Sequence, residues 1–533
     1  MLKFKKETLK GDLYGGVIAG VIALPLALAF GEASGAGPIA GLWGAILVGF
    51  FAAAFGGTGA QISGPTGPMV VVFAGLYANL SDNPALVFTA VFLGGLMMVL
   101  FGLFRFGEYI RLVPYPVISG FMSGIGGIII ALQVARLFGH EPAGSGVVPA
   151  LVSIPEAVLN PNMAAVTLGA VTLAVLFFYP KKFSKFMPTP LAALIMGTLL
   201  SFVVTGAPVL GSIPTGFPDF IMPTFDAASV AIVLEAALLL AILGAIDSLL
   251  TSLVADNMTR TKHNSNKELI GQGIGNAIAG VFGGIPGAGA TMRTAINVRS
   301  GGTTRLSGMT HSLLLLAVVL ALSPLAAQIP HTVLAAILIK VGYDIIDWNY
   351  LKIAHRGPRF DLLLMALVLV MTIFVDLITA VAVGVVLAAL AFVKQMADLQ
   401  LESLAKQPSN LTNEAERALF EKVYQKVTLY ELGGPLSFGA AAELSHRLRE
   451  NMPHEAISII DFGNVPKLDL SAAKAVEDII RDAITSEQVL YISGANGAIK
   501  ATLKPLLEET HFEGCKWFAT RLKALEAAVE AVG

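Results

Sequence analysis

The sequence predicts an α-helical membrane protein with fourteen transmembrane segments in two inverted repeats of seven, followed by a small α/β domain. Of its 533 residues, 55% are hydrophobic and only 14% are charged, and the mean hydropathy is +0.74. Soluble chains carry about a quarter charged residues, and about 20 largely apolar residues suffice to cross a bilayer. Such stretches follow one another from about residue 12 to residue 398. Most of the chain is therefore expected to lie in a membrane.

Charge, cysteine content and the N-terminus exclude several other classes. The formal net charge of −2 gives no reason to expect a nucleic-acid partner. The single cysteine, Cys515, excludes an intrachain disulfide framework. The N-terminus MLKFKKETLKGDLYGG precedes an apolar run that lacks a signal-peptide cleavage site, so it predicts an uncleaved first membrane helix. No nucleophile with a neighbouring base and no metal-ligand cluster stands out, so we expect neither an enzyme nor a cofactor.

The distribution of Lys and Arg predicts the topology. Long stretches without basic residues separate small islands of positive charge, for example between Lys10 and Arg105 and between Lys185 and Arg260. Basic residues near helix ends are retained on the cytoplasmic side of a membrane. We therefore expect a multi-pass protein of a bacterial inner or plasma membrane, with its N-terminus and its C-terminal domain in the cytoplasm.

Fourteen apolar segments can be delimited along the chain. An odd number of segments per repeat turns the second repeat upside down, as in the inverted repeats of secondary transporters. The third and tenth segments open with similar heptads, SGPTGPM (63–69) and PGAGATM (286–292). The expected spans are residues 12–34, 38–55, 64–80, 84–104, 114–137, 162–180, 187–206, 228–254, 268–284, 289–299, 306–327, 331–344, 360–376 and 377–398.

The two Gly- and Pro-rich heptads predict discontinuous helices. Irregular backbone is tolerated at membrane depth only where it is buried in protein or lines a cavity. Half-helices that start at Gly64 and Gly289 would present free backbone N–H groups and positive dipole ends at the midplane, which favours an anion there. The alternative is that these glycines only allow close helix packing.

An isolated acid predicts a cation site. Asp247 lies in the apolar stretch LLAILGAIDSLLTSLVAD, and Thr251 follows one helical turn later on the same face. A buried carboxylate is protonated, paired or bound to a cation. Together with carbonyls of Gly289, Ala290 and Thr291, the two side chains would form an oxygen-only site suited to sodium. The alternative is a structural acid that is hydrogen-bonded within the helix bundle.

Two further charged residues are candidates for a role in transport. Arg293 follows the tenth segment's heptad, and its guanidinium could face an anion, pair with Asp247 or extend to the membrane surface. Glu32 could carry a proton or lie at a rim. Glu235 and Asp376 are expected near helix ends.

Several long stretches resemble the SulP family of anion transporters. They are ALPLALAFGEASGAGPIAGLWGA, SGPTGPM, PYPVISGFMSGIG, DSLLTSLVADNMTRTKHNSNKELIGQGIGNAIAG and GGIPGAGATM. The resemblance covers nearly the whole chain and is closest to the BicA-type sodium-dependent bicarbonate transporters of that family. It implies a core domain, made of segments one to four and eight to eleven, that moves against a gate domain made of the other segments.

The resemblance also implies binding residues and two departures. Arg293 stands where the BicA type has a small residue, which favours exchange or broader anion use, and Leu26 stands where many exchanging relatives have glutamine. The implied sodium site consists of Asp247, Thr251, Gly289, Ala290 and Thr291. The implied anion site consists of Phe30, Thr66 and the N-termini of the two half-helices. The candidate residues for binding the anion are therefore Phe30, Ser63, Thr66, Ala290, Thr291 and Arg293.

After about residue 400 the composition becomes that of a soluble domain. The polar stretch LESLAKQPSNLTNEAERALFEK is followed by alternating strand and helix patterns, which predict a small α/β domain. This domain resembles the STAS domain that ends SulP transporters. Ser471, in LDLSAAKAV, is expected to cap a helix, with phosphorylation as the alternative. The expected boundaries are 1–398 for the membrane domain, 399–422 for the linker and 423–533 for the STAS domain.

These observations together predict a secondary active transporter. It would import bicarbonate with sodium as the coupling ion, by an elevator or rocking movement of the core domain, as a homodimer surrounded by membrane lipid. The alternatives are proton-coupled or exchange transport of sulfate or dicarboxylates, and a channel or membrane-bound sensor. Two discontinuous helices around an isolated acid favour a carrier, because a sensor has no need of them.

Overall fold

The chain divides into two compact units, Met1–Val385 and Val386–Gly533, which are described separately. The computed structural model describes residues 8–110, 114–142, 147–180, 182–183, 187–211, 217–375, 377–402, 413–434, 436, 457–486, 488–507 and 515–532.

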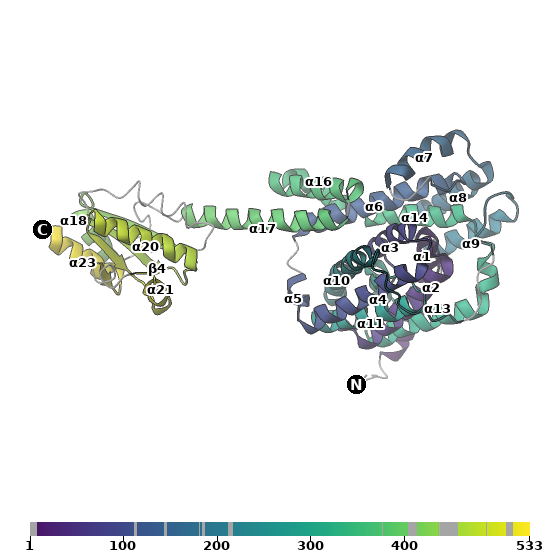
Figure 1. The fold of residues 1–533 in the computed structure, drawn as a ribbon, viewed down its shortest axis with the longest axis horizontal. Helices are drawn as coiled ribbons and strands as arrows, with labels where there is room; N and C mark the ends of the chain where they lie inside the picture. The colour runs from purple at the N-terminus through teal and green to yellow at the C-terminus, as the bar shows by residue number, and fades with distance from the viewer. Residues whose placement is uncertain are drawn as a thin grey trace. The chain divides into compact units, whose positions relative to one another are not determined.

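The first unit is built from helices (Figure 1). Each of the fourteen expected segments coincides with a helix to within a few residues. Among the described residues, six helices are long and apolar enough to cross a membrane, or seven if the bent pair α7–α8 is one span. The number of crossings therefore remains a prediction. The elements are α1 (Leu9–Ala33), α2 (Pro38–Phe55), β1 (Ser63–Gly64), α3 (Gly67–Asn79), α4 (Pro84–Leu103), α5 (Gly107–Ile110), α6 (Tyr115–Leu137), α7 (Val147–Leu159), α8 (Met163–Phe178), α9 (Thr189–Ser201), α10 (Val230–Thr259), α11 (Ser265–Val281), β2 (Ala288–Gly289), α12 (Thr291–Arg299), α13 (Arg305–Ala326), α14 (His331–Ile345), α15 (Trp348–Ile353) and α16 (Arg359–Phe374). Helix α17 (Leu377–Glu402) begins in the first unit and ends in the second.

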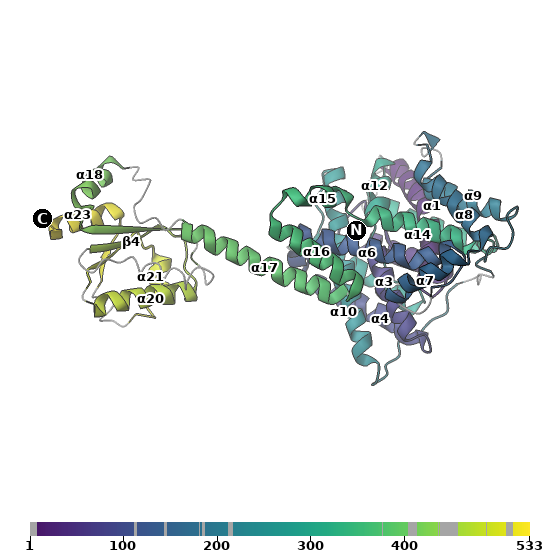
Figure 2. The ribbon, with the colours of Figure 1, turned by 90° about the horizontal axis from the view of Figure 1, so that it is seen from above.

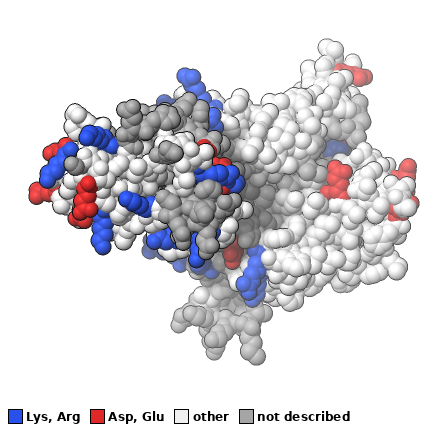
Figure 3. Space-filling model, turned by 60° about the vertical axis from the view of Figure 1, so that its left-hand side comes forward, with Lys and Arg blue, Asp and Glu red and all other residues white. Residues whose placement is uncertain are grey.

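Large apolar side chains lie on the surface of the first unit. Leu159, Phe178 and Val203 have exposed fractions of 79%, 83% and 81%. Figure 3 shows charged side chains gathered over the C-terminal unit, whereas the visible part of the first unit is nearly uncharged. Apolar surface on this scale is a liability in water, but it suits contact with lipid. The surface therefore agrees with a unit embedded in a membrane.

The helices of the first unit pack in two groups (Figure 2). The core group contains α1, α2, α4, α10, α11 and α13 together with the short helices α3 and α12, and the gate group contains α6, α8, α14 and α16. Contacts between the groups include those of α1 with α14 and of α3 with α6. These groups correspond to the core and gate that the family resemblance implied.

Glycines allow the helices of the core group to pack closely. A Cβ atom added at Gly95 in α4 would lie 2.3 Å from the backbone nitrogen of Ala277 in α11. One added at Gly273 would lie 2.5 Å from the carbonyl oxygen of Gly95. Small residues at such crossings let helix backbones approach one another. The core group therefore has little internal freedom and suits movement as one body.

The two predicted helix breaks are present, with shorter helices than expected. Gly64 and Gly289 belong to the strands β1 and β2, and α3 and α12 begin only after these strands. β1 and β2 pair antiparallel, with Ser63 opposite Gly289 and Gly64 opposite Ala288. The expected helix starts at Gly64 and Gly289 were therefore too early, because the extended backbone uses these glycines for strand pairing.

Three helices of the first unit were absent from the sequence prediction, namely α5, α7 and α15. The largest of them, α7, is bent by 111° relative to α8. Its sequence VVPALVSIPEAVL includes Pro155 inside the helix. Proline inside an apolar stretch usually ends a helix, which explains why the pattern was not interpreted as one.

The second unit is a parallel α/β domain, as the sequence predicted. Its four strands pair in the order β3-β4-β5-β6, all parallel. One hydrophobic cluster joins the sheet to α20 and α21, and another joins it to α18 and α23. The helix expected near 439–451 lies outside the described residues. The elements are α18 (Glu414–Val423), β3 (Val427–Gly433), β4 (Ile457–Asn464), α20 (Leu470–Thr485), β5 (Leu490–Ser493), α21 (Gly497–Leu503), β6 (Lys516–Phe518) and α23 (Arg521–Val532).

The N-cap of α20 differs from the sequence prediction. The side chain of Asp469 accepts a hydrogen bond from the backbone nitrogen of Ala472 at 2.8 Å, while Ser471 lies inside the helix. The prediction of a Ser471 cap was therefore wrong by two positions. Aspartate and serine are about equally good N-caps, so the sequence pattern alone did not separate them.

One arginine joins four elements of the second unit. Arg521 contacts Glu416 at 2.8 Å, Glu431 at 3.4 Å and Asp461 at 3.5 Å. Burial raises the pKa of Asp461 above its usual value, while a hydrogen bond from Ser493 and the charge of Arg521 lower it. The guanidinium therefore offsets negative charge that water reaches poorly.

We expect Arg521→Gln to destabilise the fragment 413–533 by about 2–3 kcal/mol, because breaking an ion pair that is mostly buried leaves carboxylates uncompensated. Denaturant unfolding measures the change. The matched control is Lys523→Gln, an exposed position on the same helix, which should change stability by less than about 0.5 kcal/mol. Equal effects of the two substitutions would contradict the assigned role of Arg521.

Candidate ion-binding site

The paired strands bring the N-termini of α3 and α12 together. The backbone nitrogen of Ala290 donates to the carbonyl oxygen of Ile62 at 2.8 Å. The backbone nitrogen of Ile62 donates to Thr294 Oγ1 at 3.0 Å. The first turn of α12 is thus tied to the strand that leads into α3. Each helix N-terminus carries partial positive charge. The crossing of β1 and β2, where the two strands pair, therefore favours a bound anion.

Oxygen atoms of the predicted sodium site lie in contact beside this crossing. Thr251 Oγ1 donates to the carbonyl oxygen of Gly289 at 2.9 Å and lies 2.7 Å from Thr291 Oγ1. One turn earlier on α10, Ser248 Oγ accepts from the backbone nitrogen of Gly289 at 3.0 Å. Side chains of α10 therefore hydrogen-bond both the N–H and the carbonyl group of Gly289. The carbonyl of Ala290 accepts from the nitrogen of Thr294 at 2.8 Å, so it is not the free carbonyl that we expected.

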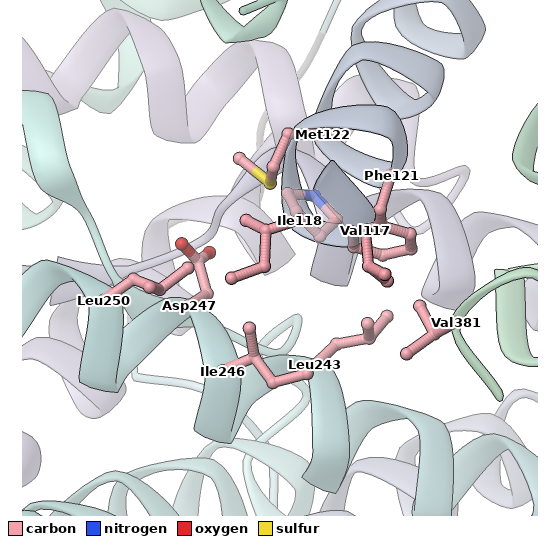
Figure 4. Close-up of a pocket in the computed structure, with 10 residues that line it drawn as sticks. Val117, Ile118, Phe121, Met122, Leu243, Ile246, Asp247, Leu250 and Val381 are labelled. Carbon is pink, nitrogen blue, oxygen red and sulfur yellow. The ribbon is translucent and has the colours of Figure 1, made fainter. Parts of the chain in front are cut away.

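Asp247 lies one helical turn before Thr251 on α10 and lines a small cavity (Figure 4). The polar side chains nearest to its carboxylate include those of Thr66 and Arg293. Thr66 Oγ1 is buried and has no hydrogen-bond partner of normal geometry in the described part of the chain. A hydroxyl group without a fixed partner is available to a ligand.

Arg293 is 3% exposed. Its Nη2 donates to the carbonyl oxygen of Pro65 at 2.6 Å, which ties α12 to the residue preceding Thr66. A Cβ atom added at Gly64 would lie 2.9 Å from its Nη1. The alternative in which Arg293 extends to the membrane surface is therefore wrong, because its side chain is enclosed. The other two predicted roles, facing an anion and pairing with Asp247, stay open.

The other predicted anion-site residues occupy different surroundings. Phe30 is buried in α1. Ser63 Oγ accepts a hydrogen bond from Gln272 Nε2 at 2.6 Å, so one of its lone pairs is occupied. Thr66 is the N-cap residue of α3 but makes no side-chain capping bond. Of the two hydroxyl groups on this stretch, that of Thr66 is the less engaged.

Glu32 joins the core group to the gate group. Its Oε1 lies 2.9 Å from Nδ1 of His331, at the start of α14. The side chains are 18% and 23% exposed. Glu32 thus has a basic partner at the interface between the two groups. This contact would change if the core group moved against the gate group. Glu235 lines a wider cavity, and Asp376 lies outside the described residues.

A fully buried acid, Glu268, lies beside the site. Glu268, in the first turn of α11, is 1% exposed. Its Oε2 accepts from the backbone nitrogens of Gly57 and Thr58, each at 2.8 Å. Its Oε1 accepts from Nε2 of Gln61 at 2.9 Å and of Gln272 at 2.8 Å. Four N–H donors therefore converge on one carboxylate.

Sequence reasoning did not single out Glu268, because an acid in the first turn of a helix is ordinary. A usable signal was present all the same. Glu268, Gln272 and Asn276 follow one another at four-residue spacing in a largely apolar part of the chain, which places three polar side chains on one helix face. Asn276 uses that position to bind Gly287, just before β2, through two hydrogen bonds of 2.8 Å.

Two known protein families match most of this chain. Residues 9–368 match the Sulfate permease family, and residues 421–521 match the STAS domain. The chain belongs to the sulfate permease family. Its C-terminal α/β unit is accordingly a STAS domain.

Relatives within the sulfate permease family extend over nearly the whole chain. The chain is 43% identical over 546 residues to the bicarbonate transporter BicA of Picosynechococcus sp., covering 99% of this chain and 96% of the relative. It is 26% identical over 549 residues to the chloroplastic sulfate transporter 4.1 of Arabidopsis thaliana, covering 97% and 79%.

Solved structures of similar proteins share the fold. The transmembrane domain of a cyanobacterial bicarbonate transporter BicA matches with 48% identity and a TM-score of 0.68, covering 71% of this chain and 99% of that one. The structure of SLC26A9 matches with a TM-score of 0.83 over 99% of this chain and 91% of that one, at 17% identity, which shows the fold alone. These matches confirm the predicted helical transporter fold with a C-terminal STAS domain.

Two cavities of this sulfate permease family member lie along α6 and α10. The smaller one, about 20 Å³, has space for about one water molecule. It is enclosed by Asp247 and by apolar side chains that include Ile118 and Phe121 of α6 (Figure 4). The larger one, about 820 Å³, lies one turn nearer the N-terminus of α10 and reaches Gln133 and Arg136 of α6.

Gly289→Ala should reduce anion uptake by at least about tenfold. The added Cβ would lie 2.3 Å from Gln61 Nε2 and 3.0 Å from Ser248 Cα, so either Gln61 or β2 must shift. Uptake into proteoliposomes measures the loss. The control is Gly75→Ala in α3, where a Cβ meets nothing within 4 Å. Wild-type uptake by Gly289→Ala would show that this close approach is unimportant.

Proposed function

We propose that this protein imports bicarbonate together with sodium across a bacterial inner or plasma membrane. The observation that carries the proposal is the cluster of oxygen atoms from Thr251, Gly289 and Thr291, one turn from Asp247 and beside two helix N-termini. A cation and an anion can bind next to each other there. Each ion then offsets part of the desolvation cost of the other.

The anion half of the site suits a small planar oxyanion. The N-termini of α3 and α12 offer backbone N–H groups and positive dipole ends. Thr66 adds a hydroxyl group without a fixed partner, and Arg293 adds a buried guanidinium. Guanidinium groups bind planar carboxylate-like anions well, and bicarbonate has this shape. We assign the anion to this place, with Ser63, Phe30 and Ala290 as its surroundings.

The cation half of the site suits sodium. Its donors are two hydroxyl oxygens, one backbone carbonyl and the carboxylate of Asp247. Hard cations prefer oxygen ligands, and no nitrogen or sulfur ligand takes part in this cluster. Opening the hydrogen bond between Thr251 and Gly289 would free both oxygens for the ion.

Similarity to the relatives supports bicarbonate as the anion. The two relatives named bicarbonate transporter BicA are 43% and 44% identical to this chain over nearly its full length. The transport role of these relatives also favours a protein that is not an enzyme. We place the N-terminus and the STAS domain in the cytoplasm, and we propose a homodimer in contact with lipid.

The transport movement we propose is a displacement of the core group against the gate group. The ions would travel with the core, since their binding residues lie on α1, α10, α12 and the two paired strands and directly before α3. The 20 Å³ cavity is too small for bicarbonate, and the 820 Å³ cavity would hold it with water. The Glu32–His331 contact joins the two groups and would have to adjust during the movement.

A second candidate function is exchange of sulfate or dicarboxylates. The observation that favours it is the permanent charge of Arg293 next to the anion site. Uptake of labelled bicarbonate, sulfate and fumarate into proteoliposomes separates the two functions. We expect bicarbonate uptake that rises with an inward sodium gradient. Uptake of sulfate or fumarate that ignores sodium and requires a counter-anion would replace the proposal.

Asp247→Asn should raise the sodium concentration for half-maximal uptake at least tenfold, a loss of about 1.4 kcal/mol. The reason is the loss of the charged ligand from an otherwise neutral set of oxygens. The matched control is Asp82→Asn, an exposed acid between α3 and α4, which should leave the sodium dependence unchanged. A folded Asp247→Asn protein with normal sodium dependence would remove Asp247 from the site.

A further inference from the structure

A buried polar network connects Glu268 to the proposed cation site. Gln61 donates its Nε2 to Glu268, and its Oε1 accepts from Ser252 Oγ at 2.8 Å. Ser252 is the residue after Thr251 on α10. The exposed fractions of Gln61, Ser252 and Glu268 are 3%, 0% and 1%. Solvent water therefore cannot replace a hydrogen bond that is lost from this network.

Gln61 also lies directly against the backbone that supplies the carbonyl ligand. A Cβ atom on Gly289 would lie 2.3 Å from Gln61 Nε2 and 2.8 Å from its Cδ. The side-chain amide therefore forms the wall behind Gly289. Any movement of Gln61 changes the position available to that glycine, and hence the place of its carbonyl oxygen relative to Thr251.

The same helix face holds both strands of the crossing. Gln272, which donates to Glu268, also donates to Ser63 Oγ of β1 at 2.6 Å. Asn276, one turn further along α11, binds Gly287 next to β2. Through these residues, Glu268 anchors a network that touches β1, β2 and α10, the three elements that meet at the ion site.

The negative charge of Glu268 is matched to its surroundings. Four N–H donors point at its two oxygens. A glutamine at this position offers one acceptor oxygen and brings two donor hydrogens of its own. Two of the four donors would then lack an acceptor in a buried place, where an unsatisfied polar group is costly. The network would have to rearrange, and Gln61 is the member that faces the site.

We propose that Glu268 is a positioning residue for the cation site, which acts through Gln61 on the Gly289 carbonyl and on the Thr251 turn of α10. This inference rests on the proposed sodium coupling. It adds a residue that never touches the ion, and its effect should fall on sodium affinity while the affinity for the anion at saturating sodium stays nearly unchanged.

The test compares Glu268→Gln with wild type in the full chain, purified in detergent. Sodium binding is measured as the rise of the unfolding temperature with sodium concentration, at constant ionic strength with choline chloride. A ligand that binds only the folded state stabilises it by RT ln(1 + L/Kd), where L is the free sodium concentration. Fitting this relation to the rise gives Kd, the sodium concentration that half-saturates the site. We expect half-saturation to require at least tenfold more sodium, about 1.4 kcal/mol of binding free energy. Bicarbonate uptake at saturating sodium should keep its half-saturating bicarbonate concentration.

The matched control is Asp12→Asn. Asp12 is also 1% exposed, and it accepts hydrogen bonds from the backbone nitrogens of Thr303 and Thr304 and from Thr304 Oγ1 at 2.6–2.8 Å. It belongs to the same unit but not to the network around Glu268. Asp12→Asn should lower the unfolding temperature without sodium and leave half-saturating sodium within about twofold. An equal sodium shift in both variants would make Glu268 a general structural acid and overturn the inference.

A second variant covers the case in which Glu268→Gln does not fold. Gln61→Met keeps a side chain of similar length against Gly289 and removes both of its hydrogen bonds to the network. It should shift sodium half-saturation in the same direction. Unchanged sodium binding in folded Gln61→Met or Glu268→Gln overturns the inference but does not affect the proposed function. Wild-type protein that neither binds sodium nor uses it for uptake overturns the proposed function, and the inference with it.

Discussion

The rest of the membrane unit depends on one constraint, the need to satisfy backbone groups where two helices stop inside a membrane. Lipid offers no hydrogen bonds, so irregular backbone at that depth must be paired within the protein. The pairing of β1 with β2 meets this need for the crossing strands. Because each strand leads directly into a helix, the pairing also fixes the N-termini of α3 and α12 beside each other. The site for an anion is thus a consequence of how the backbone is satisfied.

The charged side chains of the core group follow from the same constraint. Arg293 and Glu268 are both enclosed, and each is bound to the chain around β1: the guanidinium to the Pro65 carbonyl, the carboxylate to the nitrogens of Gly57 and Thr58. Asp247, in contrast, borders a cavity. This difference separates two kinds of buried charge. Glu268 and Arg293 have fixed partners in the crossing, and Arg293 is assigned to the anion as well, whereas Asp247 faces a cavity with space for about one water molecule.

Most of the fold could be predicted from the sequence. The length of the apolar segments, the breaks at Gly and Pro, and the change to alternating strands and helices are all local signals. The isolation of Asp247 and its spacing from Thr251 were visible for the same reason. Contacts between distant segments were not. The convergence of Gly57, Gln61 and Gln272 on Glu268 depends on how α11 packs against the loop before β1, and the Glu32–His331 contact depends on how α1 meets α14. The hydrogen bond to the Ala290 carbonyl could not be predicted either, because it depends on where α12 begins.

The central claim is that a cation and an anion share the crossing of β1 and β2, and it predicts reciprocal binding. Titration calorimetry of the purified protein would give the sodium affinity with and without bicarbonate, and the bicarbonate affinity with and without sodium. Thermodynamic linkage requires each ion to change the affinity of the other by the same factor. We expect each ion to tighten the other, because opposite charges bind side by side in a poorly solvated place. Sodium affinity that is the same with and without bicarbonate would contradict a shared site.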